Sequence, residues 1–306
     1  VVVIGSGATA VTLVPAMTDI AAKVTMIQRS PSYIVSRPGR DQFANALRRF
    51  LPEKLAYRIV RFRNIHLQNY FYRRMRKDPQ QARSKIMHLL RKDLDPRFDI
   101  DTHFTPRYDP WDQRLCLVPD ADLFRAMNAG TADIVTGEID RIDENGVLMK
   151  SGEHIQADII VMATGLQLQL LGGIPFTLDG EPIDFHQRYY YQGMMFSGVP
   201  NLIQTFGYIN ASWTLRADLN SKFVCKLVKR MDALLATRCE PTLRPEDQHM
   251  AGKNWISDFT PGYMQRGMQL FPLQGDHAPW HNTQNYLLDR KLLQRGIPND
   301  GALRFT

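Results

Sequence analysis

The sequence predicts an α/β fold with a parallel sheet at its centre, and three observations predict it. An apolar strand over residues 1–4 runs directly into a G-x-G-x-x-A turn at residues 5–10 and then into a helical segment. A second apolar strand follows at residues 24–28, about 20 residues beyond the glycines. A later apolar strand ends in the small residues 163–165. Because strand, glycine turn, helix and strand make a βαβ unit, we expect a Rossmann-like domain.

The turn after the first strand has the composition of a phosphate cradle. Gly5 permits a tight turn, and Gly7 lets the backbone approach a pyrophosphate that a Cβ would push away. Ala10 keeps the helix close to the sheet, while the free N–H groups of the first helical turn face the anion. The candidate dinucleotide-binding residues of this turn are Gly5, Ser6, Gly7, Ala8, Thr9 and Ala10.

The end of the second strand indicates which dinucleotide is bound. An NAD site places Asp or Glu there to bind the ribose 2′-hydroxyl, whereas this chain has Arg29 and Ser30. A guanidinium and a hydroxyl suit a 2′-phosphate, which favours NADPH over NADH. Further along, Ala163, Thr164 and Gly165 follow a strand over residues 159–162 that we expect to be buried. Small residues at the carboxyl end of a parallel strand allow a ligand to approach the backbone, although a plain strand-to-loop turn has the same composition.

Size and composition limit the class of protein. The chain has 306 residues, of which 44% are hydrophobic, so a sizeable core is expected. No apolar run reaches the length of about 20 residues that a membrane span needs. Three scattered cysteines predict neither a disulfide framework nor a zinc site, and we expect no metal. A reduced, cytoplasmic protein is the expectation.

Positive charge is concentrated in one segment. Residues 37–92 contain 16 Lys or Arg against three Asp or Glu, within a chain of net charge +7. Apolar residues recur there at helical spacing, so we expect two or three amphipathic helices with their charges in water, as an insertion over about residues 37–110. Binding to nucleic acid is not favoured. A surface that attracts NADPH phosphates, or that associates weakly with an anionic membrane, stays open as an alternative. The apolar positions are Leu51, Leu55, Ile59, Phe62, Ile65, Ile86, Leu89 and Leu90.

Turn signals divide the remaining chain into short elements and two domains. We expect two domains, over residues 1–166 and 167–306, because the α/β pattern stops after the small residues 163–165. The segment from residue 239 onward is rich in Pro and Trp, and we expect loops and short elements on the surface of a larger body. The other predicted elements are strands at 114–118, 132–136, 139–142 and 147–150, a strand after 198–203, and helices at 120–130 and 214–235.

Five motifs in order carry a resemblance to a known family. Together they resemble the flavin-dependent monooxygenases with two dinucleotide-binding domains, above all their Baeyer–Villiger branch and the ethionamide-activating monooxygenases within it. Such enzymes have a separate G-x-G-x-x-G motif for FAD, so we expect these residues to be a fragment that lacks this motif and is inactive in isolation. The second domain then corresponds to the C-terminal part of the FAD domain. The motifs are G-S-G-A-T-A at 5–10, Q-R-S-P at 28–31, W-D-Q-R-L at 111–115, A-T-G at 163–165 and G-V-P-N-L at 198–202.

The resemblance implies a reaction and further site residues. It implies NADPH and FAD as cofactors, and insertion of one oxygen atom from O₂ into a ketone, or its transfer to sulfur or nitrogen, through a C4a-peroxyflavin. It implies that Arg114 stabilises the peroxide, which suits a guanidinium that stays charged at any working pH. Gln113 stands where relatives often carry a Lys for the 2′-phosphate. The resemblance also implies flavin contacts around Asn210, Thr214 and Leu215.

Two other functions stay open. An FAD/NADPH reductase-like protein would use a redox pair such as C-x-x-C, and the three cysteines form no such motif. A non-catalytic nucleotide-binding module is the second alternative. The residues favour no particular organic substrate and no particular oligomeric state.

Overall fold

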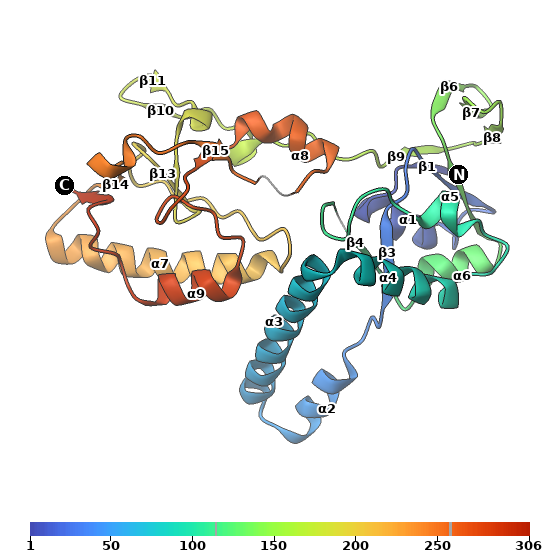
Figure 1. Ribbon diagram of the computed structural model, residues 1–306, viewed down its shortest axis with the longest axis horizontal. Coiled ribbons are helices and arrows are strands. Elements are labelled where there is room, and N and C mark those ends of the chain that lie inside the picture. Colours follow the sequence, from blue (N-terminus) through green and yellow to red (C-terminus); the bar gives the residue numbers. More distant parts are fainter. Residues whose placement is uncertain (114, 257–258) are drawn as a thin grey trace. The chain divides into compact units, whose positions relative to one another are not determined.

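The computed structural model of this chain describes residues 1–113, 115–256 and 259–306. The chain forms two compact units, Val1–Leu166 (unit 1) and Gln167–Thr306 (unit 2). Figure 1 gives the labels of their helices and strands. Each unit has hydrophobic clusters made only of its own residues.

Unit 1 is built on a four-stranded parallel sheet. The strands are β1 (Val2–Ile4), β2 (Val24–Gln28), β5 (Ala132–Thr136) and β9 (Ile160–Met162), in the order β5-β2-β1-β9. The helices α1 (Ala8–Met17) and α6 (Asp122–Asn128) pack on one face, where Val3 and Met26 belong to their cluster. This arrangement confirms the predicted α/β, Rossmann-like fold.

An antiparallel meander covers the other face of the sheet. It consists of β6 (Ile139–Asp143), β7 (Gly146–Met149) and β8 (His154–Gln156). Val147 and Met149 of β7 pack with Val2 and Ile4 of β1. Successive residues of β1 therefore face α1 and the meander in turn, as the alternation of side chains along a strand requires.

The expectation that residues 159–162 are buried is wrong. Ile159 is 55% exposed and Met162 is 63% exposed. The reason is topological, because among the described residues β9 pairs with β1 alone and forms an edge of the sheet. A strand at an edge has a neighbour on one side only, so its ends are less covered than those of a central strand.

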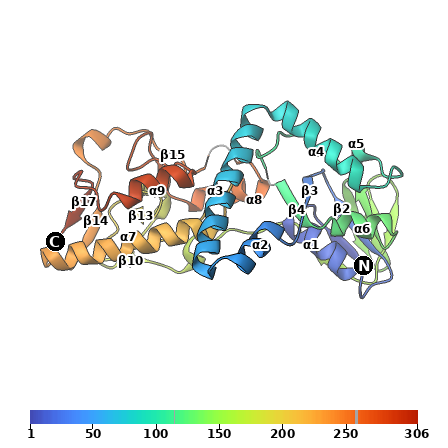
Figure 2. The same cartoon turned by 90° about the horizontal axis from the view of Figure 1, so that it is seen from below.

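Helices fill most of the segment between β3 (Tyr33–Arg37) and β4 (Leu115–Pro119), which pair in parallel. They are α2 (Gln42–Phe50), α3 (Glu53–Lys77), α4 (Pro79–Asp93) and α5 (Ile100–Phe104). Within unit 1, α2 and α3 extend away from the parallel sheet (Figure 2). Among the described residues, no helix combines the length and hydropathy that crossing a membrane requires.

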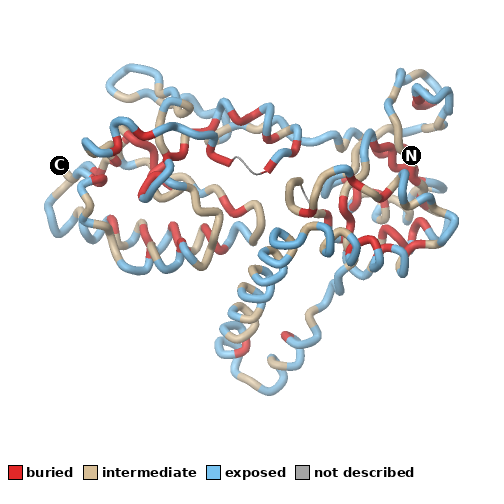
Figure 3. The backbone as a smooth tube through the Cα atoms, in the orientation of Figure 1, coloured by how far each residue is buried: buried red, intermediate tan, exposed pale blue. Residues whose placement is uncertain are grey.

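Only some of the apolar side chains of these helices are buried. Ile86 and Leu90 of α4 lie in the core of unit 1, as the helical spacing predicts. In α3, by contrast, Ala56 is the one buried residue among those described, and Phe62 is 62% exposed. Figure 3 shows α3 mostly in the colours of exposed and intermediate residues. The expectation of a covered apolar stripe on α3 is therefore wrong, because α3 packs in its own unit mainly against two other helices of the insertion.

Unit 2 is organised around the long helix α7 (Trp213–Leu234), close to the predicted 214–235. Leu219, Phe223 and Leu227 recur on its buried face, as the helical period requires. Helix α9 (Tyr286–Gln294) packs on α7, and Leu293 joins the same cluster. The short elements are η1 (Leu170–Gly173), β10 (Thr177–Leu178), β11 (Glu181–Pro182), η2 (Phe185–Gln187), β12 (Tyr190–Tyr191), β13 (Met195–Phe196), β14 (Cys239–Pro241), η3 (Pro245–Asp247), β15 (Lys253–Asn254), α8 (Gly262–Gly267), η4 (Met268–Leu270), β16 (Leu273–Gln274) and β17 (Leu303–Phe305).

Two expectations for unit 2 are corrected. Residues 197–212 are all described and contain no strand, so the strand expected after 198–203 is absent. The segment after residue 239 is part of the core rather than a surface tail. Trp280 is fully buried against Tyr191, and β17 pairs with β14. Large aromatic side chains bury much apolar area, which draws these loops inward.

A buried carboxylate in unit 2 leads to a pH-dependent stability. His277 Nε2 lies 2.8 Å from Oδ1 of buried Asp247, and its Nδ1 lies 2.6 Å from Oδ1 of Asp276. Hydrogen bonds to Asp247, and then to Asp276, raise the pKa of His277 above its usual 6.5. Arg244 also donates to Asp247, at 2.8 Å, and stays charged throughout.

We expect His277 to stabilise the fold fully below pH 6.5, the value of the unfolded chain, and to lose this effect as the pH rises through its higher folded pKa. Thermal unfolding of the wild type and of His277→Gln, followed from below pH 6.5 to about pH 9, measures this. The difference in Tm should be largest at the acidic end. A difference that grows with rising pH would contradict the charge arrangement.

Candidate dinucleotide site

The turn after β1 lies at the carboxyl edge of the parallel sheet, where the order of the strands reverses. The N–H of Gly5 donates to the carbonyl oxygen of Ile27 at 2.8 Å, and the N–H of Ala163 donates to that of Ile4 at 2.8 Å. The chain passes from β1 to β2 and β5 on one side, and β9 lies on the other side of β1. Open α/β sheets bind ligands at such a switch point. Residues 5–10 and 163–165 meet there.

Gly5 and Gly7 have different structural tasks. Gly5 has φ +137°, and a Cβ on it would lie 2.2 Å from the carbonyl oxygen of Ala163. This glycine is therefore needed for the close approach of the two segments. Gly7 is the N-cap of α1 with φ −82°, and no described atom beyond its chain neighbours lies within 4 Å of the position that its Cβ would take. The space in front of Gly7 is open, as a pyrophosphate cradle requires.

The N-terminus of α1 offers donors to an anion. Among the described residues, no side chain caps this end, and its first turn contains no acidic residue. Ala8 and Thr9 are exposed, whereas Ala10 is fully buried and packs in the core below them. The helix end combines free N–H groups with the positive end of the helix dipole, so it favours a phosphate.

Side-chain contacts bring two further segments to the turn. The Ser6 hydroxyl donates to the carbonyl oxygen of Ser30 at 3.2 Å, and its Oγ lies 3.1 Å from Oγ of Ser32. Sγ of Cys116, the second residue of β4, lies 3.9 Å from the carbonyl oxygen of Ser6. The segment after β2, which carries Arg29 and Ser30, is thus fastened to the cradle.

Arg29 is exposed at the end of β2 and has an acidic neighbour that the sequence reasoning missed. Nζ of Lys150 donates to Oε2 of Glu138 at 2.5 Å. This hydrogen bond and the charge of Lys150, with a smaller contribution from Arg29, lower the pKa of Glu138. Because Lys150 already pairs with Glu138, the acidic charge near Arg29 is largely balanced. The sequence offers only a slight signal for this neighbour: Glu138 follows two residues after β5, the strand next to β2.

A buried polar cluster fixes the end of β2. Gln28 is 1% exposed, and its Nε2 donates to the carbonyl oxygen of His103 at 2.7 Å and to Oγ1 of Thr136 at 2.8 Å. Nδ1 of His103 lies 2.8 Å from the same hydroxyl, and burial lowers the pKa of this imidazole. These bonds join α5, β2 and β5, and they fix the position from which Arg29 leaves the sheet.

The W-D-Q-R-L motif lies immediately before β4. Nε1 of Trp111 donates to Sδ of Met75 at 3.2 Å, and Nη1 of Arg76 lies 2.5 Å from Oδ1 of Asp112. Both contacts fasten the motif to the C-terminal turn of α3. Gln113 forms an isolated bridge with Pro110. Arg114, the predicted catalytic residue, lies outside the described residues.

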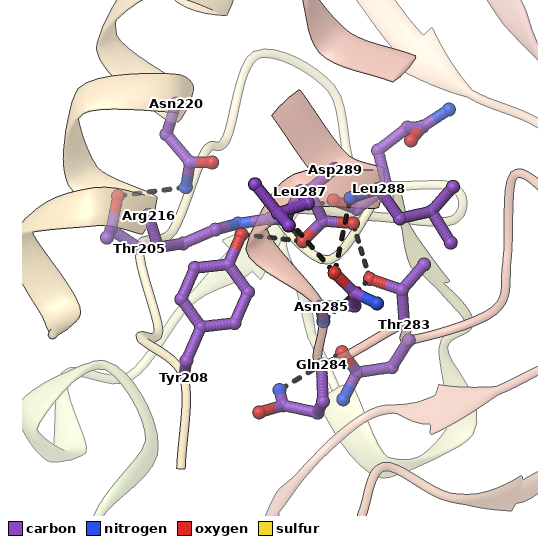
Figure 4. Close-up of polar contacts among 12 residues, drawn as sticks. Thr205, Tyr208, Arg216, Asn220, Thr283, Gln284, Asn285, Leu287, Leu288 and Asp289 are labelled. Atoms are coloured by element: carbon purple, nitrogen blue, oxygen red, sulfur yellow. Dashed lines mark hydrogen bonds and ion pairs between the residues drawn. The ribbon is translucent and has the colours of Figure 1, made fainter. Parts of the chain in front are cut away.

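The predicted flavin contacts gather in unit 2, at the start of α7. Nδ2 of Asn210 donates to the carbonyl oxygen of Gln284 at 3.1 Å. Oγ1 of Thr214 lies 2.8 Å from Oγ of Ser212, and Leu215 is buried in the first turn. Figure 4 shows the neighbouring polar network, in which Tyr208 and Arg216 meet Asp289. The sequence reasoning did not select this network.

The parallel sheet and its glycine turn define unit 1 as a domain of the dinucleotide-binding class. No protein-family model matches the chain. The chain is 47% identical over 307 residues to the FAD-containing monooxygenase EthA of Mycobacterium tuberculosis, covering 100% of this chain and 62% of that protein. It is 45% identical to the probable FAD-binding monooxygenase AlmA of Acinetobacter baylyi, of which it covers 61%. The chain is thus a homologue of the FAD-containing monooxygenases, which confirms the resemblance carried by its motifs.

Solved structures support the fold. The crystal structure of OTEMO complexed with FAD and NADP matches with a TM-score of 0.70 at 13% identity, over 100% of this chain and 66% of that one. Oxidized steroid monooxygenase bound to NADP matches with a TM-score of 0.65 at 16% identity, over 99% of this chain and 66% of that one. The chain spans about three fifths of the length of its curated relatives, 62% in the case of EthA.

Proposed function

We propose that this protein is an NADPH- and FAD-dependent monooxygenase that transfers one oxygen atom from O₂ to a small organic substrate, at a ketone, a sulfur or a nitrogen. The observation that supports it best is the open cradle at Gly7, in a chain that is 47% identical to an FAD-containing monooxygenase.

The residues of unit 1 suit NADPH. The N–H groups of residues 7–10 would hold the pyrophosphate, because they are uncapped and point out of the helix end. Arg29 and Ser30 would bind the 2′-phosphate, and Gln113 would add a polar contact in place of a cation. Ala163, Thr164 and Gly165 would let the dinucleotide pass close to the end of β9, where Gly165 has φ +110°.

Further residues would serve the flavin. Bound flavin, once reduced, supplies the chemistry that activates O₂. Asn210, Thr214 and Leu215 would contact its ring at the N-terminus of α7, whose partial positive charge favours an electron-rich group. Arg114 would stabilise negative charge on the reacting oxygen, because a guanidinium donates hydrogen bonds and does not lose its proton.

Oxygen transfer distinguishes this function from the two alternatives. We expect the full-length protein to purify with flavin absorbance near 450 nm and to oxidise NADPH faster when a ketone or a thioether is added. One oxygen atom of ¹⁸O₂ should enter the product. Flavin with NADPH oxidation but no oxygenated product would indicate a reductase-like protein. Binding of NADPH without flavin would indicate a nucleotide-binding module.

Arg29→Ala should weaken NADPH binding far more than NADH binding. A charged hydrogen bond to a phosphate contributes about 1.5–3 kcal/mol, so the KM for NADPH should rise roughly 10- to 150-fold. The KM for NADH should change little, because NADH has no 2′-phosphate. Arg141→Ala is the control, since Arg141 pairs with Asp140 at the surface of the same unit. Equal effects of Arg29→Ala on both coenzymes would contradict the assignment.

A further inference from the structure

Asp289, in the first turn of α9, collects three hydrogen bonds inside unit 2. Its Oδ2 accepts from the hydroxyl of Tyr208 at 2.7 Å and from Nη1 of Arg216 at 2.6 Å. Its Oδ1 accepts from Oγ1 of Thr283 at 2.5 Å. Figure 4 shows these side chains converging on one carboxylate. The side chains of Arg216 and Asp289 are 6% and 9% exposed, so water barely reaches the ion pair.

Tyr208 and Arg216 stand at the two ends of the segment 209–215. This segment contains the three residues proposed to contact the flavin. It is also supported in between, because the N–H of Ile209 donates to Oε1 of Gln284 at 3.0 Å and Asn210 donates to the Gln284 carbonyl oxygen. Gln284 lies between Thr283 and Asp289. One stretch, residues 283–289, therefore supports the segment at both ends and near its start.

A buried ion pair is suited to holding the segment 209–215 in one position. Hydrophobic side chains of similar volume could fill the same space with equal stability, but their contacts have no preferred direction. A carboxylate with three donors fixes the direction of each partner, and loss of the carboxylate would leave Arg216 buried without its counter-charge. Arg216 also donates through Nη2 to the carbonyl oxygen of Gln192, so it links α7 to the turn after β12.

We propose that Asp289 is a positioning residue that holds Tyr208 and Arg216 and thereby fixes the segment 209–215 for contact with the flavin. This inference rests on the proposed function, which assigns the flavin contacts to that segment. Asp289 acts through Tyr208 and Arg216, and both oxygens of its carboxylate accept hydrogen bonds from the protein.

The test compares Asp289→Asn with Asp247→Asn in the full-length flavin-loaded protein. Asp247 is a matched control, because it is also a buried aspartate of unit 2 that pairs with an arginine, Arg244. The bonds of its side chain go to residues outside both 208–216 and 283–289. Three quantities are measured: Tm, the Kd for FAD by fluorescence titration of the deflavinated protein, and amide hydrogen exchange of residues 209–215.

Both variants should lower Tm, but only Asp289→Asn should raise the Kd for FAD and the exchange rates of residues 209–215, each by about tenfold or more. Tyr208→Phe removes a single donor and keeps the ring, so it should shift both quantities in the same direction by less, even if Asp289→Asn does not fold.

Two results would overturn the inference. If the wild type binds flavin, but Asp289→Asn and Tyr208→Phe have the same Kd for FAD and the same exchange rates as Asp247→Asn, the positioning role is wrong and the proposed function stands. If the full-length wild type binds no flavin, the proposed function fails and the inference fails with it.

Discussion

Gly5→Ala is expected to destabilise unit 1 by about 3 kcal/mol or more. The new Cβ would lie 2.2 Å from the carbonyl oxygen of Ala163, and φ +137° is a conformation that alanine rarely adopts. Neither backbone can move freely, because Gly5 and Ala163 are hydrogen-bonded to the ends of neighbouring strands. Denaturant unfolding, followed by far-UV circular dichroism, measures the change in unfolding free energy.

Gly7→Ala is the matched control for stability and a test of the cradle. Its Cβ would meet no described atom of other segments within 4 Å, and φ −82° suits any residue, so only the weaker N-cap preference of alanine opposes the change, and the unfolding free energy should fall by about 1 kcal/mol at most. The Kd for NADPH should nevertheless rise, because the methyl group fills the space proposed for the pyrophosphate. Unchanged NADPH affinity would refute the cradle, and equal destabilisation by both variants would refute the local geometry.

Arg114→Ala is expected to abolish oxygenated product while flavin remains bound. Removal of a preorganised donor to a developing negative charge typically costs about 100-fold or more in rate. NADPH oxidation should slow or divert to hydrogen peroxide, because O₂ is still reduced but no oxygen reaches the substrate. Product is measured by mass spectrometry and peroxide by a coupled peroxidase assay on the same samples.

Arg141→Ala again controls for the loss of one positive charge in unit 1. Its surface pair with Asp140 contributes little, so product formation should stay at the wild-type rate. Near wild-type product formation by Arg114→Ala would mean that Arg114 is only a structural cation and that the W-D-Q-R-L motif has been misinterpreted.

Local signals in the sequence were sufficient for the elements around the cradle. The apolar strand before Gly5, the strand before Arg29 and the two strands expected at 139–142 and 147–150 all appear within one residue of the predicted positions. The helix expected over residues 214–235 forms as α7. In each case the element is specified by the spacing of its own apolar residues and by the turn residues next to it. Both signals lie within a few residues of each other, so no contact with a distant segment is needed.

The sequence by itself thus determined the α/β class, the glycine turn and the elements that adjoin it. Only the tertiary structure decided what covers each element: Met162 is exposed because β9 is an edge strand, Phe62 is exposed although its spacing is helical, and Trp280 is buried in a segment expected at the surface. The approach of Gly5 to Ala163 and the bonds of Asp289 also join residues far apart in the chain. Periodicity reports that a side chain is apolar or polar, whereas burial and hydrogen bonding depend on which distant segment packs against it.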